Sequence, residues 1–99
     1  MELMTQEILE KFRETGSQEN IPDPVIIVKY FAPWSNWTWY ATEFDEAEWI
    51  FFGYVVGIES EWWYFSLAEL QSIRGHFGLA IERDLHFGYR NISEVLEDS

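Results

Sequence analysis

The chain has 99 residues, and its 18 acidic and 6 basic residues give a formal net charge of −12. This length predicts one domain. The aromatic share of 19% excludes global disorder, because such a chain buries enough apolar surface to offset its ordering entropy. The lack of Cys excludes disulfides, thiolate metal sites and cysteine nucleophiles. Since there is no long apolar run and no signal-like segment, we expect a cytoplasmic protein outside the membrane.

A helix is predicted within residues 1–16. Ile8, Leu9 and Phe12 have helical spacing, Thr5 suits the N-cap, and Gly16 suits the position after the last turn. The polar segment 17–24 with its two prolines is expected to be a loop.

Four strands follow in the prediction, joined by short turns. Their apolar and alternating patterns place them at residues 25–32, 37–44, 49–56 and 62–65. The second strand has Trp37, Trp39 and Ala41 on one face. Gly53 in the third strand indicates a bulge or a close backbone approach. Strands in this order with short links form an antiparallel meander.

The last third of the chain is predicted to return to helix and then strand. Ser66 and Glu69 have the spacing of a capping box, which predicts a short capped helix over 66–75. Residues 81–87 alternate and are expected to be an edge strand, and residues 88–99 a tail with a last turn from Ser93. The predicted fold is α+β: an antiparallel sheet of four to five strands with two short helices. The single domain 1–99 then comprises the N-terminal helix at 1–16, the sheet-and-helix core at 25–87 and the tail.

Charge is distributed unevenly along this chain. Residues 30–72 hold seven acids, all six Trp and no base. Because nucleic acid is bound mainly through Lys and Arg, we expect no direct binding of nucleic acid there.

Several segments resemble a small bacterial family of unknown function that occurs in plasmids, phages and integrative elements. They are KYFAPWSNWTWYATEFD at 29–45, FFG at 51–53, YFSLAEL at 64–70 and IERDL at 81–85. The resemblance covers about residues 25–96 and implies an accessory protein of a mobile element. It brings no catalytic residues. The Glu61-Trp62-Trp63 turn departs from the family's usual, less aromatic pattern, so a function of that pair would be particular to this chain.

The acids and the surplus aromatics together predict a binding surface. The acids form two groups separated by the third predicted strand, about 25 Å long at 3.3 Å per residue. Carboxylates held on a sheet could imitate a phosphate row and occupy the basic, nucleic-acid-binding surface of a partner protein. With the mobile-element resemblance, this makes inhibition of a host defence protein, such as CRISPR machinery, the leading hypothesis. The predicted partner-binding residues are Glu43, Asp45, Glu46, Glu48, Glu59, Glu61, Trp34, Trp62 and Trp63.

Other interpretations stay open at this point. The acids could serve only solubility, and the spare aromatics could form a second small cluster or bind another copy in a homo-oligomer or accessory subunit. A cation cage, a hydrolytic carboxylate pair at Glu43 and Asp45, and a metal site at Glu82, Asp84 and His86 are weaker alternatives. We expect no enzyme activity, no metal and no cofactor.

Overall fold

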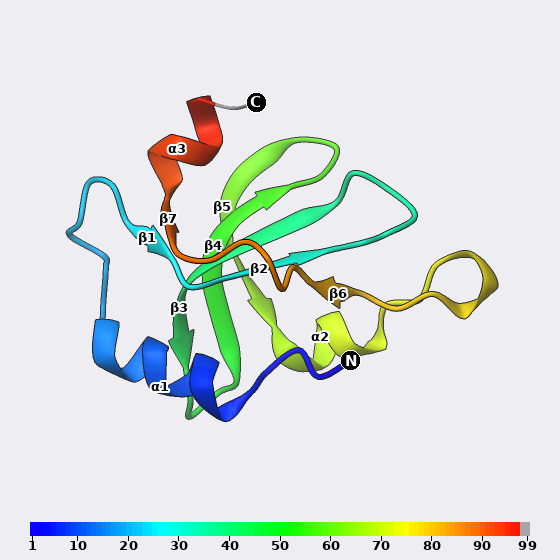
Figure 1. Ribbon diagram of the computed structural model, residues 1–99, viewed down its shortest axis with the longest axis horizontal. Coiled ribbons are helices and arrows are strands. Elements are labelled where there is room, and N and C mark those ends of the chain that lie inside the picture. The colour runs from blue at the N-terminus through cyan, green and yellow to red at the C-terminus, as the bar shows by residue number, and fades with distance from the viewer. Residues whose placement is uncertain (98–99) are drawn as a thin grey trace.

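A five-stranded antiparallel sheet is the centre of the computed structural model, which describes residues 1–97 (Figure 1). Its strand order is β5-β4-β3-β2-β6, so β2 to β5 form the expected meander and the α+β prediction is confirmed. A second, two-stranded sheet pairs β1 with β7. The elements are α1 (Gln6–Thr15), β1 (Val25–Ile26), β2 (Val28–Phe31), β3 (Thr38–Asp45), β4 (Ile50–Val56), β5 (Ser60–Ser66), α2 (Leu67–Ser72), a 3-10 turn (His76–Gly78), β6 (Glu82–Arg83), β7 (Arg90–Asn91) and α3 (Ile92–Glu97).

The expected single strand at 25–32 is wrong, because the chain changes partner within it. β1 pairs with β7, whereas β2 pairs with β3 from Val28↔Ala41 to Phe31↔Thr38. The buried amide of Gln18 binds the backbone of Val25. A continuous apolar run predicted burial correctly, but it contains no signal for where the partner changes.

Each face of the large sheet carries its own apolar cluster, and we call the face with the larger cluster the inner face. On the inner face the larger cluster joins the N-terminal segment, α1 and α2 to the sheet around Tyr30, Phe51 and Leu70. On the outer face a smaller cluster forms, and its members and the partly buried side chains packed on it are Ile26, Ile92, Val95, Tyr40, Tyr54 and Phe87. A second small cluster was one alternative for the surplus aromatic side chains; the observed cluster includes Tyr40 but, among the described residues, no Trp, so it does not cover the surplus Trp residues.

The two predicted helix caps at Thr5 and Ser66 are both present. Thr5 Oγ1 accepts from the Ile8 N–H at 3.2 Å, and Ser66 Oγ accepts from the Glu69 N–H at 2.9 Å. Gly16 follows α1 with φ of 69°, as expected. However, α2 ends at Ser72 rather than at residue 75.

The predicted edge strand at 81–87 is much shorter than expected, since β6 holds only two residues. Asp84 ends it: its carboxylate accepts from the His86 N–H at 3.0 Å and lies 3.4 Å from Lys29 Nζ. The chain turns here, and Leu85 is exposed. Phe87 packs on Tyr40, on the outer face.

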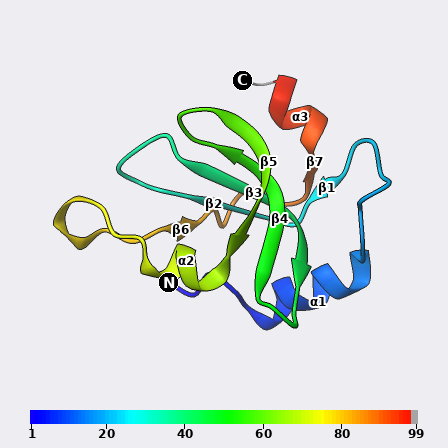
Figure 2. The same cartoon turned by 180° about the vertical axis from the view of Figure 1, so that it is seen from behind.

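The segment after Gly88, expected as a tail with one last turn, forms β7 and α3. Asp23 holds the start of α3: its carboxylate accepts from the Ser93 N–H at 2.9 Å and from the Ser93 hydroxyl at 2.7 Å. These bonds, with the β1–β7 pairing, keep the C-terminal segment close to β1, as Figures 1 and 2 show.

Candidate functional site

An open groove of about 920 Å³ lies between the loop that follows α1 and the part of the large sheet near the β3–β4 turn. Its lining comes from the end of α1, from the loop at 16–24, and from β3, β4 and β5. Figure 2 shows the β3–β4 turn beside α1 at this end of the molecule, with the β4–β5 hairpin at the other end. The groove is therefore built from segments far apart in the sequence.

The sheet side of the groove is aromatic. Phe52 lies between Trp62 and Tyr64, with ring centroids 5.8 and 4.9 Å away. The Phe52 and Trp62 rings are nearly parallel, at 15°. Tyr54 packs against Trp62 from the side, at 5.4 Å. Because these residues alternate with core residues such as Phe51, they all face the outer side of the sheet.

A bulge in β3 brings two carboxylates to the same face. The register with β4 shifts between Ala41 and Glu43, leaving Thr42 as the extra residue. Ala41 is buried in the core before the bulge, and Phe44 packs against the core after it. Glu43 consequently pairs with a groove aromatic, Phe52, and the next residue but one, Asp45, also faces outward.

The bulge is held by a buried glutamine from the opposite wall. Gln18 Nε2 donates to the carbonyl oxygens of Val25 at 2.9 Å and of Thr42 at 2.8 Å, and Gln18 Oε1 accepts from the Val25 N–H at 2.8 Å. The Thr42 hydroxyl adds a bond to the Phe52 carbonyl at 3.2 Å. One side chain thus fixes the groove wall, β1 and β3 relative to each other.

The groove carries net negative charge. Among the described residues, Arg13 is the one cation in its lining, and Glu46 binds it with a closest N–O distance of 2.7 Å. Those hydrogen bonds lower the pKa of Glu46 and raise that of Arg13. Within residues 1–97, the three carboxylates of the lining form no ion pair; they are Glu19, Glu43 and Asp45.

The other predicted acids do not line the groove. Glu46 and Glu48 lie in the exposed β3–β4 turn, where Asp45 Oδ1 accepts from the Glu48 N–H at 3.3 Å. Glu59 and Glu61 are exposed at the opposite end of β4. Six residue steps of β4 separate the two groups by about 20 Å. The turn acids are therefore distant from Glu59 and Glu61, as predicted, but Glu43 is not: it lies opposite Phe52, three residue steps or about 10 Å along β4 from the Val55 that pairs with Glu61.

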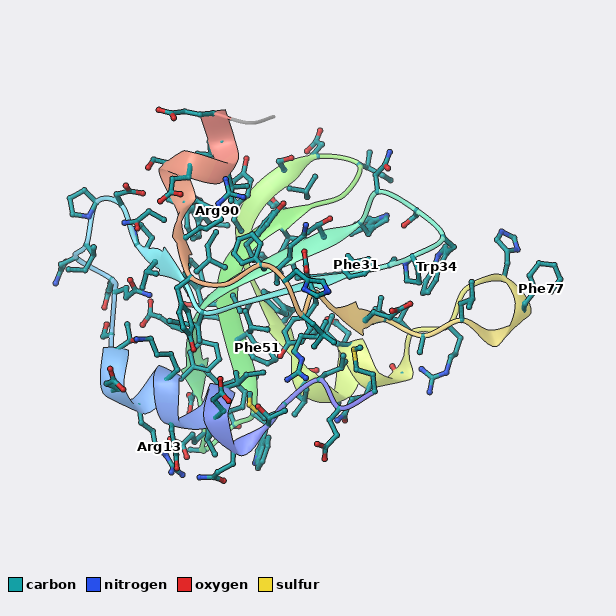
Figure 3. All side chains as sticks on the ribbon, in the orientation of Figure 1. Arg13, Phe31, Trp34, Phe51, Phe77 and Arg90 are labelled. Atoms are coloured by element: carbon teal, nitrogen blue, oxygen red, sulfur yellow. The ribbon has the colours of Figure 1, made fainter. Side chains whose placement is uncertain are left out.

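The three predicted Trp residues lie in three different places. Trp62 lines the groove, whereas Trp63 points to the opposite face of β5 and is 61% exposed. Trp34 is half-buried in the β2–β3 loop, where its ring packs on Gly75. In Figure 3, Trp34 lies near the loop of Phe77, whose fully exposed side chain projects from the side of the molecule.

Sequence reasoning missed most of the groove lining, including Gln18, Glu19, Phe52 and Tyr64. The bulge had a readable signal: two adjacent polar residues, Thr42 and Glu43, interrupt the strand where the phase of the apolar positions changes. The alternation of β4 and β5 then places Phe52 and Tyr64 opposite the core. Glu19 had no such signal, because its position depends on the path of a loop.

None of the helices within residues 1–97 is long and apolar enough to cross a bilayer. No three His, Asp or Glu side chains in the same range gather as metal ligands. Asp84, one of the three residues considered for a metal, is instead ion-paired with Lys29.

Comparison with known proteins leads to one family. No curated protein and no solved structure matches this chain. The family described as "Protein of unknown function (DUF2958)" matches residues 3–98, nearly the whole chain. The chain therefore belongs to the DUF2958 family.

Proposed function

We propose that this chain is a non-enzymatic binding protein whose groove takes a basic segment of a partner protein. The observation that carries the proposal is the combination of an aromatic surface with carboxylates that form no ion pair within residues 1–97, at Glu19, Glu43 and Asp45. A guanidinium or ammonium group would lie against the Trp62 ring while the carboxylates attract it.

The chain's own cations do not compete for those carboxylates. Lys11, Arg13, Lys29 and Arg90 are each in an ion pair with an acid outside the groove lining. Arg74 donates to two backbone carbonyls at the end of α2, and Arg83 lies in β6, outside the groove lining. The negative charge of the groove is therefore available to a partner.

The proposed partner is a protein with a basic, nucleic-acid-binding surface. The acids of the β3–β4 turn and those at the other end of β4, about 20 Å apart, suit a surface that contacts several phosphates. Binding there would exclude nucleic acid from the partner and inhibit it. The resemblance to mobile-element proteins supports a host defence protein as the target, with CRISPR machinery among the candidates and nucleic-acid mimicry as the mechanism. A cytoplasmic location is part of this proposal.

The groove half of the proposal is tested with a synthetic peptide of alternating Arg and Ala. Its affinity is measured by calorimetry at low and at high salt. We expect binding that weakens as salt rises, because salt screens exposed charges. The variant Glu43→Gln/Asp45→Asn should bind clearly more weakly. The matched control is Glu59→Gln/Glu61→Gln, which removes the same charge outside the groove and should retain most of the affinity.

Two results would contradict this proposal. Equal losses in both double variants would mean that only the overall charge attracts the peptide. Unchanged binding in the groove variant together with loss in Trp62→Ala would mean that the aromatics act without the acids. A duplex DNA probe is expected not to bind the chain at any salt concentration.

A second candidate function is that of an accessory subunit or homo-oligomer that uses its exposed aromatic side chains. The exposure of Trp63 and Tyr64 on β5 favours it. Apolar association of this kind would persist at high salt, whereas the electrostatic binding proposed above would not.

A further inference from the structure

The outer edge of β5 is a long strand edge protected by a single charge. β5 pairs with β4 without interruption from Ile50↔Ser66 to Val56↔Ser60, and no strand lies on its other side within the described chain. Alternate residues therefore direct backbone N–H and C=O groups outward. Proteins usually protect such edges with Pro, charged side chains, a bulge or a very short strand. β5 has seven residues and no Pro, Lys or bulge, and Glu61 is its one charge.

The side chains of this edge are also incompletely covered. Trp63 is 61% exposed, Tyr64 62% and Trp62 37%. Trp63 faces the inner side of the sheet, and the other two face the outer side. By contrast, the opposite edge of the sheet is β6, which has two residues of opposite charge. Exposed aromatic surface thus coincides with the one long edge, among the described residues, whose backbone groups are available for pairing.

We infer that β5 pairs with β5 of a second copy, antiparallel, about a two-fold axis at Trp63. In an antiparallel pair, two residues directly opposite each other have their side chains on the same side of the sheet. A two-fold axis must therefore lie between two copies of the same residue rather than between neighbouring residues. Trp63 is the middle of Ser60–Ser66, and an axis there pairs all seven residues. Trp62 of each copy then lies opposite Tyr64 of the other copy. This gives two aromatic cross-strand pairs, and such pairs stabilise a sheet. This dimer would give the second candidate function a definite geometry.

The net charge of −12 does not prevent this register at physiological salt. Glu61 faces Phe65 of the other copy rather than an acid. Its own two-fold mate lies four residue steps away along the strand, about 13 Å, which exceeds the Debye length of about 8 Å. The remaining repulsion is screened, so added salt should strengthen the dimer. This trend is opposite to that of peptide binding in the groove, so the two proposals can fail independently.

The area involved sets the expected strength. With the exposed fractions given above, the three aromatic side chains expose about 400 Å² of surface per copy. If all of this surface is buried, two copies and their main chains bring the interface to at most about 1,200 Å² in total, the lower end of the range of stable complexes. We therefore expect a weak, reversible dimer.

The test uses single cysteines, since the chain has none of its own. In Trp63→Cys the two thiols would face each other across the axis, where Cα atoms are about 4.5–5.5 Å apart and the geometry suits a disulfide. The matched control is Glu61→Cys, on the same face of the same strand, whose mate is too distant. Under mild oxidation we expect covalent dimer from Trp63→Cys and essentially none from Glu61→Cys.

Sedimentation of the unmodified chain supplies the second readout. We expect the dimer fraction to rise with concentration, to rise again with salt, and to fall in Trp63→Lys, which places two cations opposite each other. The inference is overturned if the unmodified chain stays monomeric up to near-millimolar concentration, or if Trp63→Cys forms no more covalent dimer than Glu61→Cys. More efficient cross-linking from Trp62→Cys or Tyr64→Cys would overturn the register.

Discussion

Replacing Gln18 by Leu tests whether one buried amide holds the groove together. Leu keeps roughly the volume of the side chain but removes all three hydrogen bonds to Val25 and Thr42. Gln18 is only 7% exposed, so water does not fully replace those bonds. At about 1 kcal/mol for each bond, the free energy of unfolding should fall by about 3 kcal/mol. Since small domains are stable by about 5–15 kcal/mol, the loss is large but leaves a folded protein.

The measurement is urea unfolding, followed by the fluorescence of the six Trp residues. A loss of this size corresponds to a fall of at least about 12 °C in Tm for a domain of this length. The control is Gln6→Leu, which removes an exposed bond to Glu10 and should change stability by less than about 0.5 kcal/mol. A loss below about 1 kcal/mol in Gln18→Leu would refute the view that this amide supports the bulge.

The same variant connects stability to the groove. Gln18 and Thr42 both line it, and the bulge at Thr42 sets the face on which Glu43 lies. Gln18→Leu should therefore weaken binding of the Arg-containing peptide even where the protein is fully folded. Unchanged peptide affinity in the folded variant would show that the bulge keeps its geometry without the amide.

Two other perturbations follow from the structure. In Gly53→Ala the new methyl group would lie 2.0 Å from the Tyr40 carbonyl oxygen, so we expect a loss of at least about 2 kcal/mol in the free energy of unfolding; Gly88→Ala, with φ of 70° and open space around it, should cost about 1 kcal/mol, and equal urea midpoints would contradict this ordering. The Ser93 hydrogen bonds lower the pKa of Asp23, so the carboxylate's contribution to stability is present above its unfolded pKa of about 3.9 and is lost as pH falls through the lower folded value. Stability should fall in acid, and it should fall less steeply in Asp23→Asn; identical pH profiles of the two proteins would rule out this role.

The fold was predictable where the local sequence preferences agree with the tertiary contacts. The caps at Thr5 and Ser66, the β2-to-β5 meander and the close approach at Gly53 depend on neighbours within a few residues or on simple alternation. The break after Ile26 could not be predicted, because every residue from 25 to 28 is apolar and the partner of Val25, Gln18, belongs to a loop.

The candidate site was predictable only in its chemistry. Glu43, Asp45 and Trp62 were selected from charge and aromatic content, yet their meeting in one groove depends on the bulge and on strand register. Trp34 was selected on the same grounds, but its ring packs on Gly75, away from the groove. Composition indicates which groups are present, whereas register determines which of them share a surface.

The bulge at Thr42 has a consequence for how this protein can change. Because β3 switches faces there, its first half is committed to the inner core and the residues at 43 and 45 are not. Substitutions at those two positions can alter charge or ligand preference without disturbing the packing of Trp39 and Ala41. A single extra residue thus separates the part of the strand that must stay apolar for folding from the part that is open to selection for a new partner.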